Sequence, residues 1–307
     1  MPADRRAFLT ALAAGLSAPA VLRARVAKRY PIGFSTLGCP AWSWQTILAQ
    51  ADQLGYASLE LRGVAGEMDL TRVPELAGSR LASTKKDLAA LGLVVSDLGA
   101  SSRMHEKAAG VRAAQLDEGR RFIDLAHAMD VKYVRVFGDK FPEGETRADV
   151  MARVVEGLQQ LAAHAAPAGV TVLLESHGDF TRSKDLVAIE RAVHSDAFAL
   201  LWDAHHTFVA GNEAPSDTYA AIGPLVHHTH LKDSKAHGTD RRYVLIGEGE
   251  VPVKTQVTVL AKAGYKGFYS FEWEKTWHPE IEEPEVAFPH FARTMAAYLA
   301  DAGVSPT

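Results

Sequence analysis

From Tyr30 onward, short apolar runs alternate with longer segments in which apolar residues recur at helical spacing. The short runs are rich in β-branched residues and predict eight strands, at Ile32–Ser35, Ser58–Leu61, Val94–Leu98, Tyr133–Phe137, Thr171–Glu175, Ala199–Asp203, Val226–Leu231 and Phe268–Glu272. The longer segments predict helices at Trp44–Leu54, Ser79–Leu91, Arg112–Met129, Arg147–Ala166, Ser183–His194, Val253–Ala263 and Val286–Ala302. A weaker helical pattern lies at Pro215–Ile222.

Several predicted helices end at a glycine that leads into the next strand, as at Leu91-Gly92 and Ala168-Gly169. Strands that alternate with helices in this way predict a parallel sheet buried on both faces. Eight such units predict a single closed (β/α)8 TIM barrel over residues 30–303. The alternative is a doubly wound open sheet, which would need a glycine-rich phosphate turn after an early strand. The sequence has no such turn and no linker long enough to separate two domains.

The first 24 residues resemble an export signal rather than part of the fold. Arg5 and Arg6 precede Phe8 and Leu9, and an apolar run rich in alanine follows. This pattern is typical of a twin-arginine signal, and a general secretory signal or a frayed helix is the alternative. We expect cleavage and a periplasmic or extracellular mature protein without stable membrane insertion. Removal of residues 1–24 leaves 30 basic and 36 acidic side chains, a net charge of −6.

Composition excludes several classes of protein. The 307 residues are 47% hydrophobic and 23% charged, as in ordinary globular domains, so intrinsic disorder is excluded. The single cysteine, Cys39, rules out an internal disulfide and a cysteine-built zinc site. The net charge of −4 argues against a nucleic-acid partner.

Four predicted strands, consecutive along the chain, carry a side chain that can bind a metal at or near their carboxyl ends. These residues are Glu175, Asp203, a histidine of His228-Thr229-His230, and Glu272. Since barrel active sites form where strands end, we expect the four side chains to meet. Three carboxylates this close repel one another unless a cation neutralises them, and the same motifs carry no cluster of arginines. Mn²⁺ suits this donor set best, and Co²⁺, Mg²⁺ and Zn²⁺ also fit. The alternative is that these groups only make structural hydrogen bonds.

The motifs around these residues resemble the xylose-isomerase-like barrel superfamily, in its sugar phosphate isomerase/epimerase branch. They are Glu-Ser-His-Gly-Asp at 175–179, Trp-Asp-Ala-His-His at 202–206, His-Thr-His-Leu-Lys-Asp at 228–233 and Phe-Glu-Trp-Glu at 271–274. Gly247-Glu248-Gly249 and Glu60-Leu61-Arg62 extend the similarity. The resemblance implies that Glu175, Asp203, His230 and Glu272 bind one divalent metal ion and that His206 binds a substrate oxygen. It also implies proton transfer next to a carbonyl, and a dimer or tetramer.

This ligand set suits the formation of an enediolate, with Glu175 and Glu272 as the two groups that remove and return the proton. Further side chains are candidates for substrate binding, and four of them have a named structural alternative. His177 is either a substrate ligand or a loop-packing residue, and Lys232 either steadies an oxyanion or is an exposed partner of Asp233. Arg62 and Arg135 either face the mouth of the barrel or pair with Glu60 or Asp139. Trp277 is a candidate apolar platform for a sugar, as are Trp42 and Trp44.

The remaining polar groups have plainer interpretations. His205 is expected to be structural, and Asp240-Arg241-Arg242 to form a solvated loop. The leading function is a metal-dependent isomerase or epimerase of a small carbohydrate. Because phosphorylated sugars are scarce outside the cytoplasm, a free ketose or a keto-glycoside is favoured. The alternatives are a lyase or dehydratase that shares the first step, a non-catalytic sugar-binding protein, and an endonuclease with three zinc ions.

Overall fold

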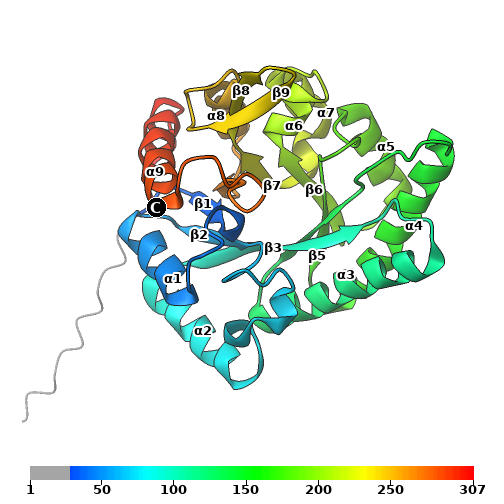
Figure 1. Ribbon diagram of the computed structural model, residues 1–307, viewed down its shortest axis with the longest axis horizontal. Helices are drawn as coiled ribbons and strands as arrows, with labels where there is room; N and C mark the ends of the chain where they lie inside the picture. The colour runs from blue at the N-terminus through cyan, green and yellow to red at the C-terminus, as the bar shows by residue number, and fades with distance from the viewer. Residues whose placement is uncertain (1–27) are drawn as a thin grey trace, which may run out of the picture.

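The computed structural model describes residues 28–307 of the chain. Within them, eight parallel strands close into a barrel in the order β1, β10, β7, β6, β5, β4, β3, β2 (Figure 1). The bounds are Ile32–Ser35 (β1), Ser58–Leu61 (β2), Val94–Arg103 (β3), Tyr133–Phe137 (β4), Thr171–Glu175 (β5), Phe198–Asp203 (β6), Val226–Leu231 (β7) and Tyr269–Phe271 (β10). The predicted (β/α)8 barrel is confirmed.

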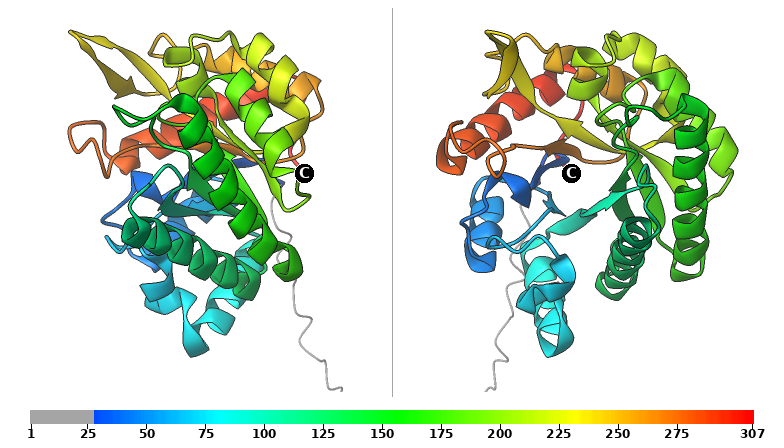
Figure 2. Two further views of the ribbon diagram at one scale, coloured as in Figure 1. Left: turned by 90° about the vertical axis from the view of Figure 1, so that its right-hand side faces the viewer. Right: turned by 45° about the vertical axis from the view of Figure 1, so that its right-hand side comes forward.

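The helices surround the barrel (Figures 1 and 2). They span Trp44–Gln53 (α1), Gly78–Leu91 (α2), Ala109–Met129 (α3), Arg147–Ala165 (α4), Ser183–Val193 (α5), Ala204–Val209 (α6), Pro215–Ile222 (α7), Val253–Lys262 (α8) and Pro284–Asp301 (α9). The short helix α6 was not predicted, because six residues are too few to show a helical period. Gly92 and Gly169, predicted to end helices, adopt φ angles of 64° and 68°, in the left-handed region that glycine favours.

Side chains of the strands alternate between the helices and the barrel interior. On β5, Val172 and Leu174 belong to the main hydrophobic core, which lies between the strands and the helices. Leu173, from the same strand, instead forms a small separate apolar cluster with Ala199 and Leu201. Glu175 and Asp203 lie two positions after Leu173 and Leu201, so their side chains point into the same interior. The polar ends of β5 and β6 therefore lie directly above this apolar layer.

Two strands that the sequence pattern did not predict form an antiparallel hairpin after β7. They are Asp233–His237 (β8) and Asp240–Val244 (β9). The predicted solvated loop at Asp240-Arg241-Arg242 is therefore wrong, because these residues pair with β8. Their side chains are mostly exposed, so no apolar alternation marks the strand. Figure 2 shows the hairpin extending away from the barrel on the same side as the loop between β10 and α9.

The tryptophans after β1 lie in the core and not at the mouth of the barrel. Trp42 and Trp44 are buried, and the Trp42 ring packs at 5.4 Å from that of Phe288. The Trp42 Nε1 donates a hydrogen bond of 2.9 Å to Glu285. Their interpretation as sugar platforms is wrong, because both rings are buried, and for Trp42 the contacts come from α9, which is distant in sequence.

The predicted export signal at residues 1–24 lies outside the described residues. From residue 28 to the end of the chain, none of the helices has the length and hydrophobicity needed to cross a membrane.

Candidate functional site

The four predicted metal ligands meet at the carboxyl ends of adjacent strands. Glu175 and Asp203 end β5 and β6, His230 is the penultimate residue of β7, and Glu272 follows β10. All four are buried, and one donor atom from each lies within 4.8 Å of the others. They converge because parallel strands end at one rim and the side chains occupy interior-facing positions.

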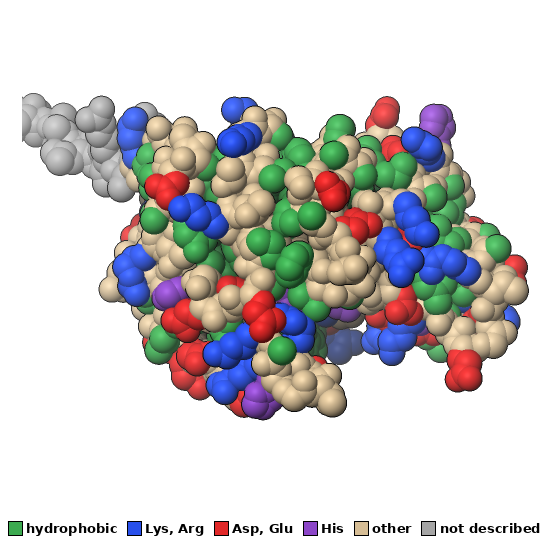
Figure 3. Space-filling view, turned by 90° about the horizontal axis from the view of Figure 1, so that it is seen from above, with side chains coloured by type: hydrophobic (Ala, Val, Ile, Leu, Met, Phe, Trp, Pro, Cys, Tyr) green, Lys and Arg blue, Asp and Glu red, His purple; other side chains and the backbone are tan. Residues whose placement is uncertain are grey.

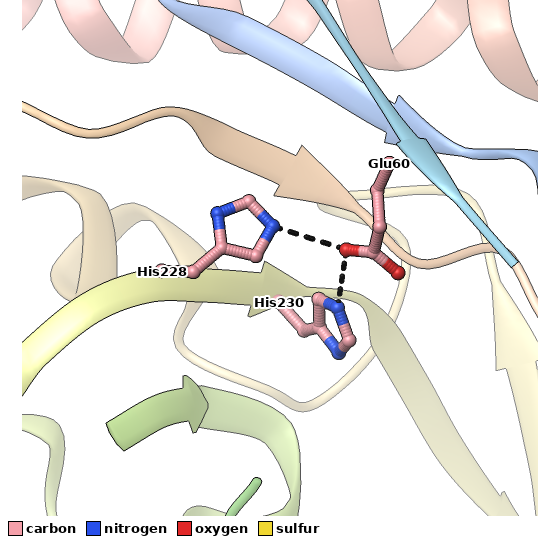
Figure 4. Close-up of side chains that lie close together, drawn as sticks. All are labelled: Glu60, His228 and His230. Carbon is pink, nitrogen blue, oxygen red and sulfur yellow. Dashed lines mark hydrogen bonds and ion pairs between the residues drawn. The ribbon is translucent and has the colours of Figure 1, made fainter. Parts of the chain in front are cut away.

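His230 lies at the centre of this cluster. Its Nδ1 is 3.4 Å from a carboxylate oxygen of Glu175, 3.3 Å from one of Glu272 and 3.9 Å from one of Asp203. Its Nε2 points the other way and lies 2.6 Å from Glu60 Oε2 (Figure 4). When Nε2 carries the proton and donates it to Glu60, the Nδ1 lone pair is free to face the carboxylates.

Glu60 is a member of the site that sequence reasoning did not select. Its Oε2 also lies 3.0 Å from Nε2 of His228, so one oxygen joins both histidines of the His-Thr-His motif (Figure 4). Burial opposes ionisation of Glu60, but the two histidines outweigh burial and hold its pKa below the ordinary range. The available signal was its place at the end of a strand, beside Leu61 and Arg62.

The residues present fit a divalent metal ion. Two donor atoms at the centre of the cluster are buried and have no hydrogen-bond partner within residues 28–307: Nδ1 of His230 and Oε1 of Glu175. Buried polar atoms without partners are costly, and an ion held between them would satisfy them. Three carboxylates and one imidazole are donors for hard or borderline ions such as Mn²⁺, Mg²⁺, Co²⁺ or Zn²⁺.

Two buried cations neutralise part of the cluster, although the motifs that carry the four residues contain no cluster of arginines. The Arg135 guanidinium lies 3.1 Å from Glu175 Oε2. The Lys232 ammonium is fully buried and lies 2.8 Å from Asp203 Oδ2 and 2.6 Å from Glu274 Oε1, and it also contacts Glu272. Charge repulsion alone is therefore a weaker argument for a metal ion than the unpartnered donor atoms.

Lys232 is not the exposed partner of Asp233 that was considered as an alternative. Asp233 instead accepts hydrogen bonds of 2.8–3.1 Å from four backbone N–H groups, those of Ser234, Gly247, Gly249 and Val251. A Cβ on Gly249 would lie 2.1 Å from Asp233 Oδ1, so only glycine fits there. The Gly-Glu-Gly motif thus fixes the segment that follows the β8–β9 hairpin.

The electrostatics of the cluster differ from one carboxylate to the next. Burial raises the pKa of Asp203 to about 7, even though Lys232 favours its ionised form. Burial acts in the same direction on Glu175 and Glu272, but neighbouring cations outweigh it and lower both pKa values. The dominant cations are Arg135 for Glu175, and His230 with Lys232 for Glu272. Both glutamates are therefore ionised at neutral pH.

A small cavity of about 60 Å³ lies at the mouth of the barrel, next to the cluster. Arg62, His177 and Trp277 line it together with Arg135, Glu272 and Glu274. The Arg62 and His177 side chains do face the mouth, and Arg62 pairs with neither Glu60 nor Asp139. Trp277 is 54% exposed, so its ring is accessible from solvent.

Two neighbouring histidines have different surroundings. His206 Nε2 is 3.5 Å from Asp203 Oδ2, and its ring lies 4.8 Å from that of His177, so both border the cluster. His205 is buried, and its Nε2 lies 2.7 Å from the hydroxyl of Ser234 at the base of the hairpin. The predicted structural role of His205 agrees with this contact.

A larger cavity, of about 420 Å³, opens at the opposite end of the barrel. Its lining comes from residues at or near the amino ends of strands, among them Val94, Tyr133, Val226 and Phe268. Conserved chemistry in such barrels lies at the carboxyl ends of the strands. The site is therefore assigned to the mouth with the four ligands, although the cavity there is smaller.

The chain is similar to known proteins over most of its length. Residues 48–292 match the model of the xylose isomerase-like TIM barrel family. L-ribulose-5-phosphate 3-epimerase UlaE of Escherichia coli is 23% identical over 286 residues, which cover 91% of this chain and 98% of that protein.

Two solved structures show the same fold. The structure of an L-ribulose 3-epimerase has a TM-score of 0.72 at 19% identity and covers 89% of this chain and 95% of its own. The IOLI protein, solved with a bound zinc atom, has a TM-score of 0.71 at 18% identity, with 88% and 97% coverage. Since the family model spans well over half of the sequence, the chain belongs to the xylose isomerase-like TIM barrel family.

Proposed function

We propose that this protein is a divalent-metal-dependent isomerase or epimerase of a keto-sugar or keto-glycoside. The observation that carries the proposal is the buried cluster of Glu175, Asp203, His230 and Glu272, with unpartnered donor atoms at its centre. The similarity to sugar epimerases supports the same class of reaction. A divalent ion held by these four residues would supply charge that stabilises an oxyanion on the substrate.

The two glutamates are the proposed acid–base pair. Glu175 on β5 and Glu272 after β10 approach the cluster from strands on either side of β6 and β7. Both are ionised, so either can accept the proton next to the carbonyl; the other takes up a proton from solvent and delivers it to the enediolate, and the first then releases its proton to solvent. Return to the opposite face of the same carbon gives an epimer, and return to the neighbouring carbon gives an isomer. Each positioned group typically contributes about 10²–10⁴-fold.

The surrounding residues have supporting roles in this proposal. Lys232 holds Asp203 and Glu272 through its ion pairs, and its burial keeps it from reaching solvent. His206 and His177, which border the cluster, bind substrate hydroxyls through ring nitrogens that have no hydrogen-bond partner in the structure. Trp277 offers an apolar face to the sugar ring at the entrance.

Exchange of substrate hydrogen with solvent deuterium tests this function. Glu175→Gln and Glu272→Gln should each lower kcat/KM for exchange by about 10²–10⁴-fold, because the amide cannot accept the proton. Glu248→Gln is the matched control, since Glu248 is exposed on a loop and should leave the rate unchanged. Metal content is measured in each variant. Near wild-type exchange in both variants with metal bound would refute the proposal.

Product analysis separates the alternatives. Epimerisation and isomerisation retain every atom of the substrate, whereas a lyase or dehydratase loses a group from the same enediolate, so NMR spectra of the product mixture distinguish them. Sugar binding that depends on metal but gives no exchange would favour a non-catalytic binding protein.

Figure 3 shows Lys and Arg interspersed with Asp and Glu on the face that carries β8, β9 and α8, which offers no continuous basic surface for a nucleic acid there.

We also propose that residues 1–24 direct export. The twin arginines Arg5 and Arg6 and the apolar run after them support this proposal. Fusing residues 1–24 to a reporter protein should carry the reporter out of the cytoplasm, and an Arg5→Lys, Arg6→Lys variant should prevent this. A reporter that stays in the cytoplasm with the native segment would overturn the proposal.

A further inference from the structure

Arg62 carries a buried charge that makes no direct ion pair with any carboxylate in the described part of the chain. It follows the end of β2 and is only 6% exposed, and its Nη1 is buried without a hydrogen-bond partner. Its guanidinium makes no ion pair within residues 28–307, although it lines the cavity at the mouth. A buried charge without a partner is costly, and such costs are typical of positions kept for function.

The neighbouring arginine differs in this respect. Arg135 forms an ion pair of 3.1 Å with Glu175 and donates a hydrogen bond of 3.1 Å to the carbonyl of Ala100. Burial and the charge of Arg135 lower the pKa of Arg62 to about 10, although the more distant carboxylates of Glu118, Glu272 and Glu175 act in the opposite direction, and Arg62 stays charged at neutral pH. Arg62 is therefore the cation of the pair that is free to bind an anion.

The backbone of β3 makes room for both arginines. A Cβ on Gly99 would lie 2.7 Å from Arg62 Cδ and 2.7 Å from Arg135 Nη2. Any larger residue would push the two side chains out of position. Packing against β3 therefore helps to hold both guanidiniums beside the cluster. For Arg62 this packing takes the place of an ion pair, which it lacks.

We propose that the substrate carries a carboxylate, which binds Arg62 while the carbonyl end lies at the four-ligand cluster. This inference rests on the proposed function and narrows its substrate class to keto-sugar acids and their glycosides. A guanidinium presents two parallel N–H donors that match a planar carboxylate. A phosphate monoester carries about −1.5 to −2 charges, which one guanidinium beside Glu272 and Glu274 would not balance.

Three ligands with the same carbon skeleton test the substrate class. D-fructuronate carries a carboxylate at C6, D-fructose is neutral, and D-fructose 6-phosphate carries a phosphate. Calorimetry on the metal-loaded protein should give the tightest binding for D-fructuronate. Equal affinities for D-fructuronate and D-fructose, or preference for the phosphate, would overturn the inference.

Substitutions of Arg62 test whether this residue causes the preference for D-fructuronate over D-fructose. Arg62→Gln should weaken D-fructuronate binding by about 10- to 100-fold and change D-fructose binding by less than about twofold, because one charge-assisted interaction is lost. Arg62→Lys should fall between. Arg103→Gln is the matched control, since Arg103 ends β3 at the same end of the barrel but its side chain is half exposed. The loss of both ligands in Arg62→Gln would contradict the assignment.

Two readouts keep this inference separate from the function on which it rests. The melting temperature of Arg62→Gln should equal or exceed that of the wild type, because a buried unpaired charge is removed; a lower value would indicate a structural role. Deuterium exchange reports on proton transfer alone. If no ligand exchanges hydrogen, the proposed function fails, whereas the binding preference can still be measured.

Discussion

At the scale of single residues, the site depends on how Glu60 holds His230. One carboxylate oxygen lies within hydrogen-bond distance of two imidazoles, and this geometry aims Nδ1 of His230 at three carboxylates. Partners of this kind orient a ligand histidine and raise its basicity. In the proposed metal site, the carboxylate of Glu60 would therefore strengthen metal binding without touching the ion.

Glu60→Gln should lower the affinity for Mn²⁺ by about 10- to 100-fold, because a neutral amide supports the histidine less well than a carboxylate. Competition with a fluorescent chelator measures this affinity. Asp97→Asn is the matched control, a change of the same kind on β3, where neither carboxylate oxygen has a hydrogen-bond partner. Burial raises the pKa of Asp97 well above its ordinary value. Equal losses in the two variants would contradict the role of Glu60.

At the scale of elements, polar side chains join segments that the strand–helix pattern leaves unconnected. Asp69 precedes the short 3-10 turn at Leu70–Arg72 and accepts hydrogen bonds from the backbone and hydroxyl of Thr71. Its other partner is Arg121 on α3, at 2.8 Å. The turn after β2 is therefore attached to the helix that follows β3.

Asp69→Asn should lower the free energy of unfolding by about 1 kcal/mol at pH 7, through the loss of the partly buried ion pair with Arg121, whereas the asparagine oxygen can still cap the turn. Burial opposes ionisation of Asp69, but Thr71 and Arg121 outweigh it and lower its pKa in the folded state. The stabilisation is therefore complete above the unfolded pKa of about 3.9 and is lost as the pH falls through the folded value.

Denaturant titrations at pH 7 and below pH 4 measure this pH dependence. The wild type and Asp69→Asn should differ at neutral pH and converge in acid. Asp87→Asn, an exposed position on α2, serves as the control and should match the wild type at both pH values. A difference between wild type and Asp69→Asn that does not depend on pH would argue against the ion pair.

The element scale also separates what the sequence pattern could predict from what it could not. The barrel strands and seven of the helices have strong apolar periodicity, and their predicted ends agree with the structure to within a few residues, apart from the longer β3. The hairpin β8–β9 has no apolar face, and α6 is too short to show a period. Both follow strands that end in the site, so the errors fall on the loops near the mouth.

At the scale of the whole molecule, the ligands join four neighbouring strands of the closed barrel, β5, β6, β7 and β10. An ion that binds this arrangement and not the unfolded chain stabilises the entire fold. Metal at 100 times its Kd should add about 2.7 kcal/mol to the free energy of unfolding. For a domain of this size, each kcal/mol raises Tm by about 2–4 °C.

Differential scanning calorimetry in Mn²⁺ and in a chelator measures the shift. The wild type should melt several degrees higher in Mn²⁺, whereas a variant with Asp203→Ala and His230→Ala should melt at the same temperature in both. Identical melting of the wild type under the two conditions would mean that the cluster holds no ion and that Lys232 and Arg135 alone balance its carboxylates.

The sequence by itself determined the barrel and the four residues that meet at its rim. Apolar periodicity is local, and the carboxyl ends of parallel strands share one edge, so Glu175, Asp203, His230 and Glu272 could be brought together without coordinates. Only the tertiary structure decided what surrounds them. The burial of Lys232 among three carboxylates, the joining of His228 and His230 by Glu60 and the unpaired charge of Arg62 arise from contacts between segments far apart in the chain. Such contacts leave no periodic signal, because they depend on how side chains from different strands fill the same interior.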